Sequence, residues 1–83
     1  MVLVRGRVIE AYTGRGIAGA LVSIGGRTAI TDSEGRFEIS DLPAGSYEIR
    51  VTHRDYEPAR VVRIFEEGEY EVSITLMPRF RVL

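Results

Sequence analysis

The chain has 83 residues, no cysteine, one histidine and a formal net charge of −1, from 11 arginines and 12 acidic residues. A chain of this length forms one domain at most and buries only about 60–65% of the surface that it exposes when unfolded. The lack of cysteine excludes a disulfide scaffold, a thiolate zinc site and a catalytic cysteine, and the single histidine excludes a multi-histidine metal site within one chain. The balanced charge differs from the strong basic excess of nucleic-acid-binding proteins. We therefore expect no cofactor, no metal and no nucleic-acid partner.

No apolar run approaches the roughly 20 residues that a helix needs to cross a bilayer, so we expect no membrane insertion. The first eight residues, MVLVRGRV, carry arginines too early for a signal peptide. All the basic side chains are arginine, and the chain contains no lysine, asparagine or glutamine. Two explanations stay open for this bias: a protein from a hot environment, where ion pairs and few thermolabile amides are common, or a GC-rich genome.

Apolar and polar residues alternate along most of the chain, and helical spacing is absent. One apolar and one polar face per strand is typical of antiparallel sheets. Turn signals recur at the spacing expected of a β-sandwich. The pattern predicts seven strands, at residues 2–10, 19–24, 27–31, 36–40, 46–53, 59–65 and 69–77.

The early strands are separated by glycine-rich turns. In the strand at 19–24, Ala20, Val22 and Ile24 share one face. Gly25 and Gly26 then supply the positive φ angles that a two-residue hairpin requires. We therefore expect 19–24 and 27–31 to pair as a hairpin.

The stretch 31–45 contains acids that invite a choice between a metal or catalytic site at Asp32, Glu34 and Asp41 and a set of turns. Asp32 suits the first position of a type I turn, where its carboxylate accepts backbone N–H bonds, and Gly35 suits the last position. An EF-hand loop needs about twelve residues of spaced ligands, which this stretch does not provide. The turn is the favoured interpretation. Residues 42–45 (LPAG) are expected to carry the chain from one sheet to the other, with Leu42 closing the core.

The later strands repeat the alternation. Their predicted inward residues are Phe37 and Ile39, then Tyr47, Ile49 and Val51, then Tyr70, Val72, Ile74 and Leu76. Residues 66–69 (EEGE) read as a solvated hairpin loop. Because one sheet cannot cover both faces of so thin a chain, the inward faces are expected to meet as two packed sheets. The sequence predicts an all-β, seven-stranded antiparallel Greek-key sandwich, a single domain over 1–83 with residues 79–83 as a tail or edge extension.

Several short motifs occur in a recognisable order. They are residues 6–8 (GRV), 13–14 (TG), 17–22 (IAGALV), 31–37 (TDSEGRF), 42–47 (LPAGSY) and 55–58 (DYEP). From about residue 4 to residue 76 the chain thus resembles the carboxypeptidase regulatory-like domain, a transthyretin-like (prealbumin-like), immunoglobulin-like β-sandwich. The resemblance implies a non-catalytic accessory domain of a larger secreted or cell-surface protein. Asp55 stands where that family usually has glycine, and we expect it to keep the left-handed turn, which Asp tolerates better than most residues.

Two related groups with covalent chemistry do not fit these residues. The transthyretin-like hydroxyisourate hydrolases use several histidines and a C-terminal Tyr-Arg-Gly-Ser, whereas this chain has His53 alone and ends in RFRVL. The collagen-adhesin B-type domains form a lysine–asparagine isopeptide bond, and both residue types are missing here. His53 also lacks an evident nucleophile and orienting partner, so we expect it to be a solvent-facing residue at a strand end.

Glu38, Asp41 and Glu48 are the candidates for a carboxylate pair of the kind used in glycoside hydrolysis, which requires two carboxyls facing each other across a cleft. A convex sandwich with outward-pointing acids offers no such cleft. Cross-strand ion pairs with Arg36 and Arg50 are the favoured interpretation. We therefore predict that the chain is not an enzyme.

Aromatic and arginine residues define a candidate interaction surface. Since Phe37, Tyr47 and Tyr70 read as core, only the other four aromatics could form the exposed platform of a carbohydrate-binding module, which is the alternative function. Residues 79–81 (RFR) interleave an aromatic with cations, as in some contacts with bases or sugars, but arginines at a sheet edge also discourage aggregation. The candidate surface comprises Tyr12, Tyr56, Phe65, Arg79, Phe80 and Arg81.

The chain ends are apolar, with VLV at residues 2–4 and VL at 82–83. If these segments did not pair within the chain, they would be exposed and would favour self-association or docking through an edge strand. The overall prediction is a structural or protein-interaction module whose partner is a neighbouring domain, another protein or a second copy, with carbohydrate as the alternative ligand.

Overall fold

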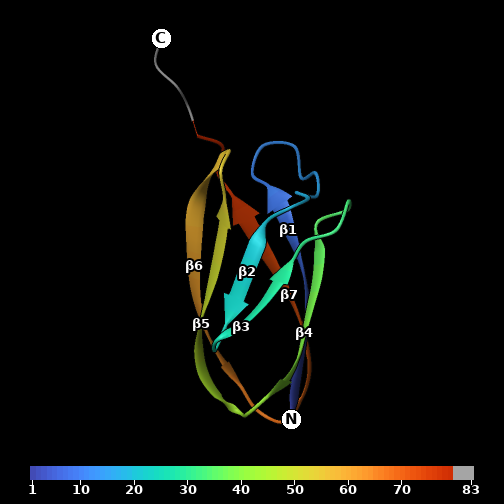
Figure 1. Ribbon diagram of the computed structural model, residues 1–83, viewed down its shortest axis with the longest axis vertical. Helices are drawn as coiled ribbons and strands as arrows, with labels where there is room; N and C mark the ends of the chain where they lie inside the picture. The colour runs from blue at the N-terminus through green and yellow to red at the C-terminus, as the bar shows by residue number, and fades with distance from the viewer. Residues whose placement is uncertain (80–83) are drawn as a thin grey trace.

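The computed structural model describes residues 1–79 and confirms the predicted all-β sandwich, with seven strands and no helix in that range (Figure 1). Most predicted strands begin and end within two residues of the observed bounds. The exception is β6, which begins three residues earlier than predicted. The strands are β1 (Val2–Glu10), β2 (Leu21–Ile24), β3 (Arg27–Ile30), β4 (Arg36–Leu42), β5 (Gly45–His53), β6 (Tyr56–Phe65) and β7 (Gly68–Leu76).

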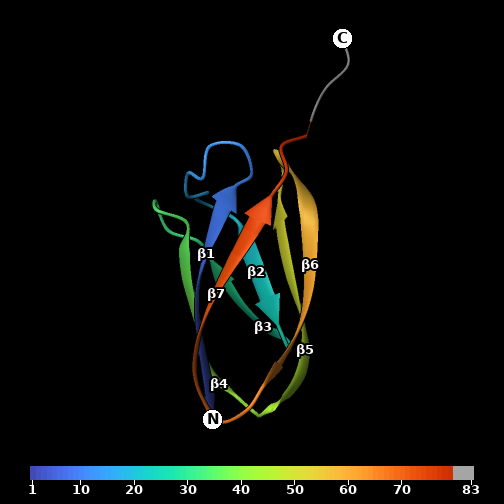
Figure 2. The ribbon, with the colours of Figure 1, turned by 180° about the vertical axis from the view of Figure 1, so that it is seen from behind.

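The strands form two sheets that pack face to face. One sheet has three strands in the order β4-β1-β7, and the other has four in the order β3-β2-β5-β6. All pairings are antiparallel as predicted except that of β1 with β7, which is parallel and continuous from Val2↔Gly68 to Glu10↔Leu76. Figure 2 shows β1 and β7 side by side with both arrows in the same direction.

The parallel pair arises from the link between β6 and β7, where the prediction of a hairpin loop at 66–69 was wrong. β6 belongs to the four-stranded sheet and β7 to the three-stranded sheet, so this link crosses between the layers. After the crossing, β7 lies beside β1, which is far from it in sequence. Alternation within a strand does not specify such a partner.

The core lies between the two layers and is built from alternate residues, as the period-two pattern predicts. β1 is the central strand of its sheet, and its Val2 and Val4 are fully buried. The apolar N-terminal segment therefore pairs within the chain and is not exposed, and residues 82–83 lie outside the described range. The buried apolar residues are Val2, Val4, Val8, Ile17, Ala20, Val22, Ile24, Phe37, Ile39, Leu42, Ile49, Val51, Phe65, Ile74 and Leu76.

The tight connections largely follow the sequence prediction. Gly25 and Gly26 have φ angles of 57° and 82°, as the β2–β3 hairpin requires. Leu42 is buried where residues 43–44 cross from the three-stranded to the four-stranded sheet. The left-handed conformation expected at Asp55 is found instead at Asp41, with a φ of 61°. None of the described segments is a helix that could span a bilayer.

Candidate functional site

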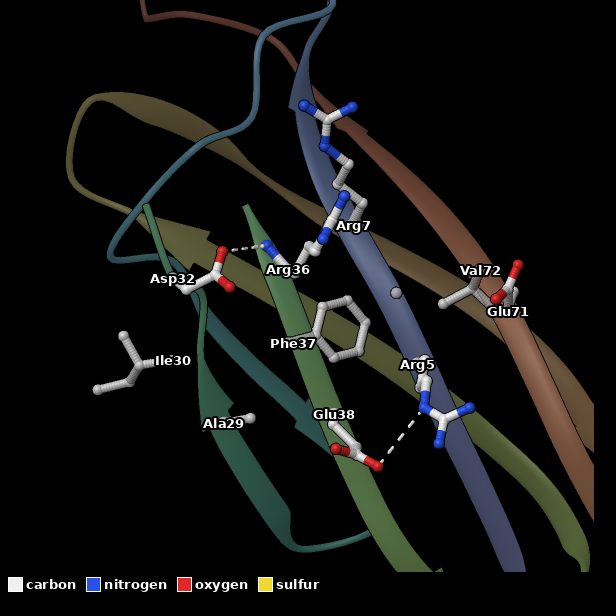
Figure 3. Close-up of a pocket in the computed structure, with 11 residues that line it drawn as sticks. Arg5, Arg7, Ala29, Ile30, Asp32, Arg36, Phe37, Glu38, Glu71 and Val72 are labelled. Atoms are coloured by element: carbon white, nitrogen blue, oxygen red, sulfur yellow. Dashed lines mark hydrogen bonds and ion pairs between the residues drawn. The ribbon is translucent and has the colours of Figure 1, made fainter. Parts of the chain in front are cut away.

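A hollow of about 670 Å³ lies over the three-stranded sheet and the edge of β3 (Figure 3). Most of its walls are charged side chains carried by neighbouring strands. The floor is formed by Gly6, Phe37 and Val72, which are cross-strand partners on β1, β4 and β7. The residues that line the hollow are Arg5, Gly6, Arg7, Ala29, Ile30, Asp32, Arg36, Phe37, Glu38, Glu71 and Val72.

The floor of the hollow is closed by the ring of Phe37, which fills the space that a side chain on Gly6 would occupy. A Cβ atom on Gly6 would lie 2.4 Å from Phe37 Cζ and 2.8 Å from Val72 Cγ2. In Figure 3 the ring of Phe37 lies between β4 and β1, and Val72 points toward it from β7. Because Phe37 is only 6% exposed, the hollow offers no aromatic face for a sugar.

The charges around the hollow neutralise one another. Arg5 lies 3.6 Å from the carboxylate of Glu38 and 3.2 Å from that of Glu69, and Arg36 lies 3.3 Å from that of Glu34. Glu38 was predicted to pair across strands with Arg36 or Arg50; the β1–β4 register instead places Arg5 directly opposite Glu38. All these side chains are more than half exposed, and each such pair contributes less than about 1 kcal/mol.

Glu38, Asp41 and Glu48, the candidates for a catalytic carboxylate pair, are not brought together. Glu38 lies on β4 in one sheet, and Glu48 lies on β5 in the other. Glu48 lies 3.2 Å from the predicted Arg50, which however stands on the same strand, and 3.9 Å from Arg60 across the β5–β6 pair. Asp41 is the next-to-last residue of β4 and has the left-handed φ of 61°. The three acids therefore face no common cleft.

The Asp32 carboxylate is occupied by its own turn, which confirms the turn prediction. Its Oδ1 accepts hydrogen bonds from the backbone N–H groups of Glu34 and Arg36, each at 2.9 Å. These bonds hold the pKa of Asp32 below its usual value of 3.8, and the bond from the N–H of Arg36 has a larger effect than that from the N–H of Glu34. Gly35 has the left-handed φ of 82°. Within residues 1–79, no three metal-ligating side chains lie close enough to hold an ion.

Thr31 is a structural residue that the sequence prediction passed over. The residue is only 4% exposed. Its hydroxyl donates a hydrogen bond to the carbonyl of Ile17 at 2.6 Å and accepts one from the N–H of Ala20 at 2.8 Å. Two backbone bonds, Thr31 N–H to Ala20 O and Gly19 N–H to Thr31 O, complete the junction. The available signal was the position of a threonine between the end of β3 and the turn aspartate.

The adjoining glycines permit close contact between the two loops at this end of the sandwich. Val8 donates to the carbonyl of Gly35 at 2.8 Å and accepts from Ile17 at 2.9 Å. A Cβ on Gly35 would lie 2.4 Å from the carbonyl oxygen of Val8, and one on Gly16 would lie 1.9 Å from that of Glu34. The glycines of the sequence motifs thus allow the backbone of residues 16–17 and 34–35 to pack closely and to hydrogen-bond with Val8.

The prediction that His53 faces solvent was wrong. Its side chain is 16% exposed and meets the ring of Tyr56 edge-on, with centroids 5.2 Å apart and the planes at 82°. His53 Nδ1 accepts a hydrogen bond from the N–H of Asp55 at 3.1 Å. The histidine is half-buried because the β5–β6 turn folds its ring against the first residue of β6.

The candidate interaction surface is only partly present on the described surface. Phe65 is 2% exposed and packs against Tyr70 and Tyr47, with ring centroids 4.8 Å and 6.3 Å apart, so its predicted exposure is wrong. It falls on the inward row of β6, beneath the crossing to β7. Tyr12 is 64% exposed, and Tyr56 is half-buried against His53. Phe80 and Arg81 lie outside the described residues.

Arg79 is bound to the β5–β6 turn. Its N–H donates to the carbonyl of Asp55 at 3.1 Å, and its Nε donates to that of Tyr56 at 2.9 Å. Met77 O accepts from the N–H of Glu57 at 2.8 Å, and Pro78 bridges Tyr56 in antiparallel fashion. Residues 77–79 therefore lie along the start of β6.

Comparison with known families agrees with the motifs. The sequence model of the carboxypeptidase regulatory-like domain matches residues 3–77, which is almost the whole chain. This chain belongs to that family. No curated protein matches the sequence.

The carboxypeptidase regulatory-like domain is similar in structure to parts of larger solved proteins. One is a chain from a type II cohesin–X-dockerin complex of Acetivibrio cellulolyticus, an N-terminal interface mutant, with 25% identity, a TM-score of 0.78, and coverage of 94% of this chain and 58% of that chain. A C-terminal interface mutant of the same kind of complex has 29% identity, a TM-score of 0.75, and coverage of 92% and 57%. The domain thus spans less than two thirds of these chains.

The 5-hydroxyisourate hydrolase of Klebsiella pneumoniae shares the fold, with 17% identity, a TM-score of 0.69, and coverage of 96% of this chain and 93% of the hydrolase. At this identity the likeness concerns the fold alone. It agrees with the transthyretin-like sandwich and transfers no activity to the carboxypeptidase regulatory-like domain.

Proposed function

We propose that this carboxypeptidase regulatory-like domain is a non-catalytic structural and protein-interaction module, an accessory part of a larger secreted or cell-surface protein. The observation that carries the proposal is the use of the polar motif residues. Thr31 bonds to backbone groups of Ile17 and Ala20 in the neighbouring loop, and Asp32 bonds to backbone groups of its own turn. Glu38 and Glu48 pair with arginines on separate sheets. Such residues stabilise a scaffold and converge on no reacting atom.

The structural relatives support an interaction role. Solved structures with 25% and 29% identity are cohesin–X-dockerin complexes, which are assemblies of protein with protein. A carbohydrate platform gains no support, because Phe65 is buried and Tyr12 is the exposed member among the platform aromatics that the structure describes.

The test has two arms and uses the full chain. We expect no turnover of chromogenic ester, phosphate or glycoside substrates, and we expect localised NMR shift changes when the ¹⁵N-labelled chain is titrated with the domains encoded next to it. Turnover that disappears in a His53→Ala or Glu48→Gln variant would refute the proposal. The absence of shift changes with every neighbouring domain would also count against it.

A further inference from the structure

β6 has a long free edge. It is the outermost strand of the four-stranded sheet and runs for ten residues, whereas β3 at the opposite edge runs for four. Figure 1 and Figure 2 show β6 as the outer ribbon of its layer in both views. An edge strand presents unpaired N–H and C=O groups that can template a further strand. Pro58, which cannot donate a ladder hydrogen bond, is compatible with this edge position.

The chain itself already uses part of this edge. Residues 77–79 pair in antiparallel fashion with its first residues, through Glu57 N–H to Met77 O, Arg79 N–H to Asp55 O and the bridge between Tyr56 and Pro78. Within residues 1–79 no strand continues this pairing beyond Glu57. The edge therefore accepts an antiparallel segment at one end and stays open over 59–65.

The open part of the edge carries exposed apolar side chains. Val62 and Ile64 alternate along the face that points away from the core, and they are 64% and 74% exposed. Both belong to an edge strand, so an added strand would lie directly beside them. Its apolar side chains would remove these two from water.

The open part is also positively charged. Between Pro58 and Phe65 the strand has Arg60 and Arg63 and no acidic residue. Arg60 lies only 3.9 Å from the exposed carboxylate of Glu48, and Arg63 forms no ion pair with any described residue. The guanidinium of Arg63 instead donates to the backbone carbonyl of Val62 at 3.0 Å, so it rests on the strand's own backbone.

We propose that residues 59–65 bind an extended segment of a partner protein in which acidic and apolar residues alternate, added to β6 as an antiparallel strand. This inference rests on the proposed function as an interaction module. Main-chain hydrogen bonds supply affinity in strand addition, and alternate side chains supply specificity. Val62 and Ile64 contact the apolar residues of the segment, and Arg63 leaves the carbonyl of Val62 to pair with a carboxylate opposite it.

The same charges argue against a second copy of this chain as the occupant. The antiparallel register that sets Val62 against Ile64 of a second copy also sets Arg63 against Arg63. Like charges directly opposite each other destabilise a strand pair. Arg63 therefore disfavours pairing of β6 with a second copy and provides the contact for an acidic partner.

The test measures binding of the full chain to a fluorescein-labelled peptide, Lys-Thr-Val-Glu-Val-Thr-Glu, by fluorescence polarisation. In antiparallel order its valines face Ile64 and Val62, and its glutamates face Arg63 and Arg60. We expect saturable binding that Arg63→Glu weakens by about tenfold. Arg27→Glu, the same charge change on the opposite edge strand, should leave binding unchanged. A peptide with both valines replaced by proline should not bind.

A charge-reversed peptide, with lysine in place of both glutamates, should bind the Arg63→Glu variant more tightly than the wild type. Ile64→Thr serves as a second variant, with a loss of affinity of roughly threefold or more. Thermal melts of each variant establish that it is folded. Equal binding of the first peptide to wild type and Arg63→Glu would overturn the inference, as would a stable dimer of the free chain in sedimentation.

Failure here and failure of the proposed function are distinguishable. Shift changes with a neighbouring domain that map away from β6 would overturn the strand-addition inference and support the interaction module. Substrate turnover lost with His53→Ala would overturn the module itself, and with it the inference.

Discussion

The Thr31 hydroxyl offers the sharpest test of how this fold is held together. Thr31→Val keeps the shape of the side chain and replaces the hydroxyl with a methyl group. In the native protein that hydroxyl bridges the carbonyl of Ile17 and the N–H of Ala20, at 2.6 Å and 2.8 Å. The valine variant therefore leaves one acceptor and one donor without this partner in a buried position.

The expected loss of stability follows from those two groups. A buried polar group without a partner costs about 1–3 kcal/mol, so for two such groups we expect a loss of about 2–6 kcal/mol in the free energy of unfolding. For 83 residues the total stability is roughly 4–12 kcal/mol. Each kcal/mol lost lowers the melting temperature by roughly 4–8 °C in a domain of this length.

Urea unfolding at constant pH measures the effect, as a lower midpoint at an unchanged m-value. Thr28→Val, at an exposed position of β3, the strand that ends directly before Thr31, is the matched control and should change stability by less than about 0.5 kcal/mol. Thr31→Ser keeps the hydroxyl and should recover most of the loss. A Thr31→Val variant as stable as the Thr28→Val variant would refute the reasoning.

Three further predictions test the turn, the floor of the hollow and the buried aromatic. Because backbone N–H groups hold the pKa of Asp32 below 3.8, its carboxylate stabilises the fold fully above that pH, and the stabilisation is lost as the pH falls through the lower folded pKa. Asp32→Asn, which keeps an acceptor oxygen but does not titrate, should flatten the acid limb of urea stability measured from about pH 5 down to about pH 2; an acid limb as steep as that of the wild type would contradict this. Gly6→Ala should lower the free energy of unfolding by about 1–3 kcal/mol because Phe37 must move, and Phe37→Leu in that background should recover part of it; a neutral Gly6→Ala variant would show that the ring does not occupy this position. Phe65→Ala should cost about 3–5 kcal/mol in thermal or urea unfolding, whereas the exposed control Ile64→Ala should cost less than about 0.5 kcal/mol; similar values for the two would show that Phe65 is not part of the core.

The candidate site shows where sequence reasoning stops. The role of Asp32 was predictable because a turn aspartate bonds to backbone two and four residues onward, within the same short segment. The partner of Glu38 was not predictable, because the register of β4 against β1 places Arg5 opposite it from a distant part of the chain. The free edge of β6 likewise depends on which strands end each sheet.

Phe65 and His53 were misplaced for a related reason. Both stand at strand ends, where alternation gives the weakest signal and the path of the following segment decides exposure. The crossing to β7 covers Phe65 with Tyr70, and the turn into β6 brings Tyr56 against His53. In each case the covering residue lies only a few positions away, but its direction is set by the change of sheet or by the turn geometry.

The sequence alone determined the number of strands, the inward face of each strand, the glycine and aspartate turns, and the family, because period-two alternation and turn chemistry act over a few neighbouring residues. Only the tertiary structure decided that β7 runs parallel to β1, that Thr31 joins two loops, and that the outer edge of β6 is left open beside Arg63. These features depend on contacts between segments far apart in the chain. Such contacts are selected by the packing of two whole sheets against each other, and no local pattern encodes them.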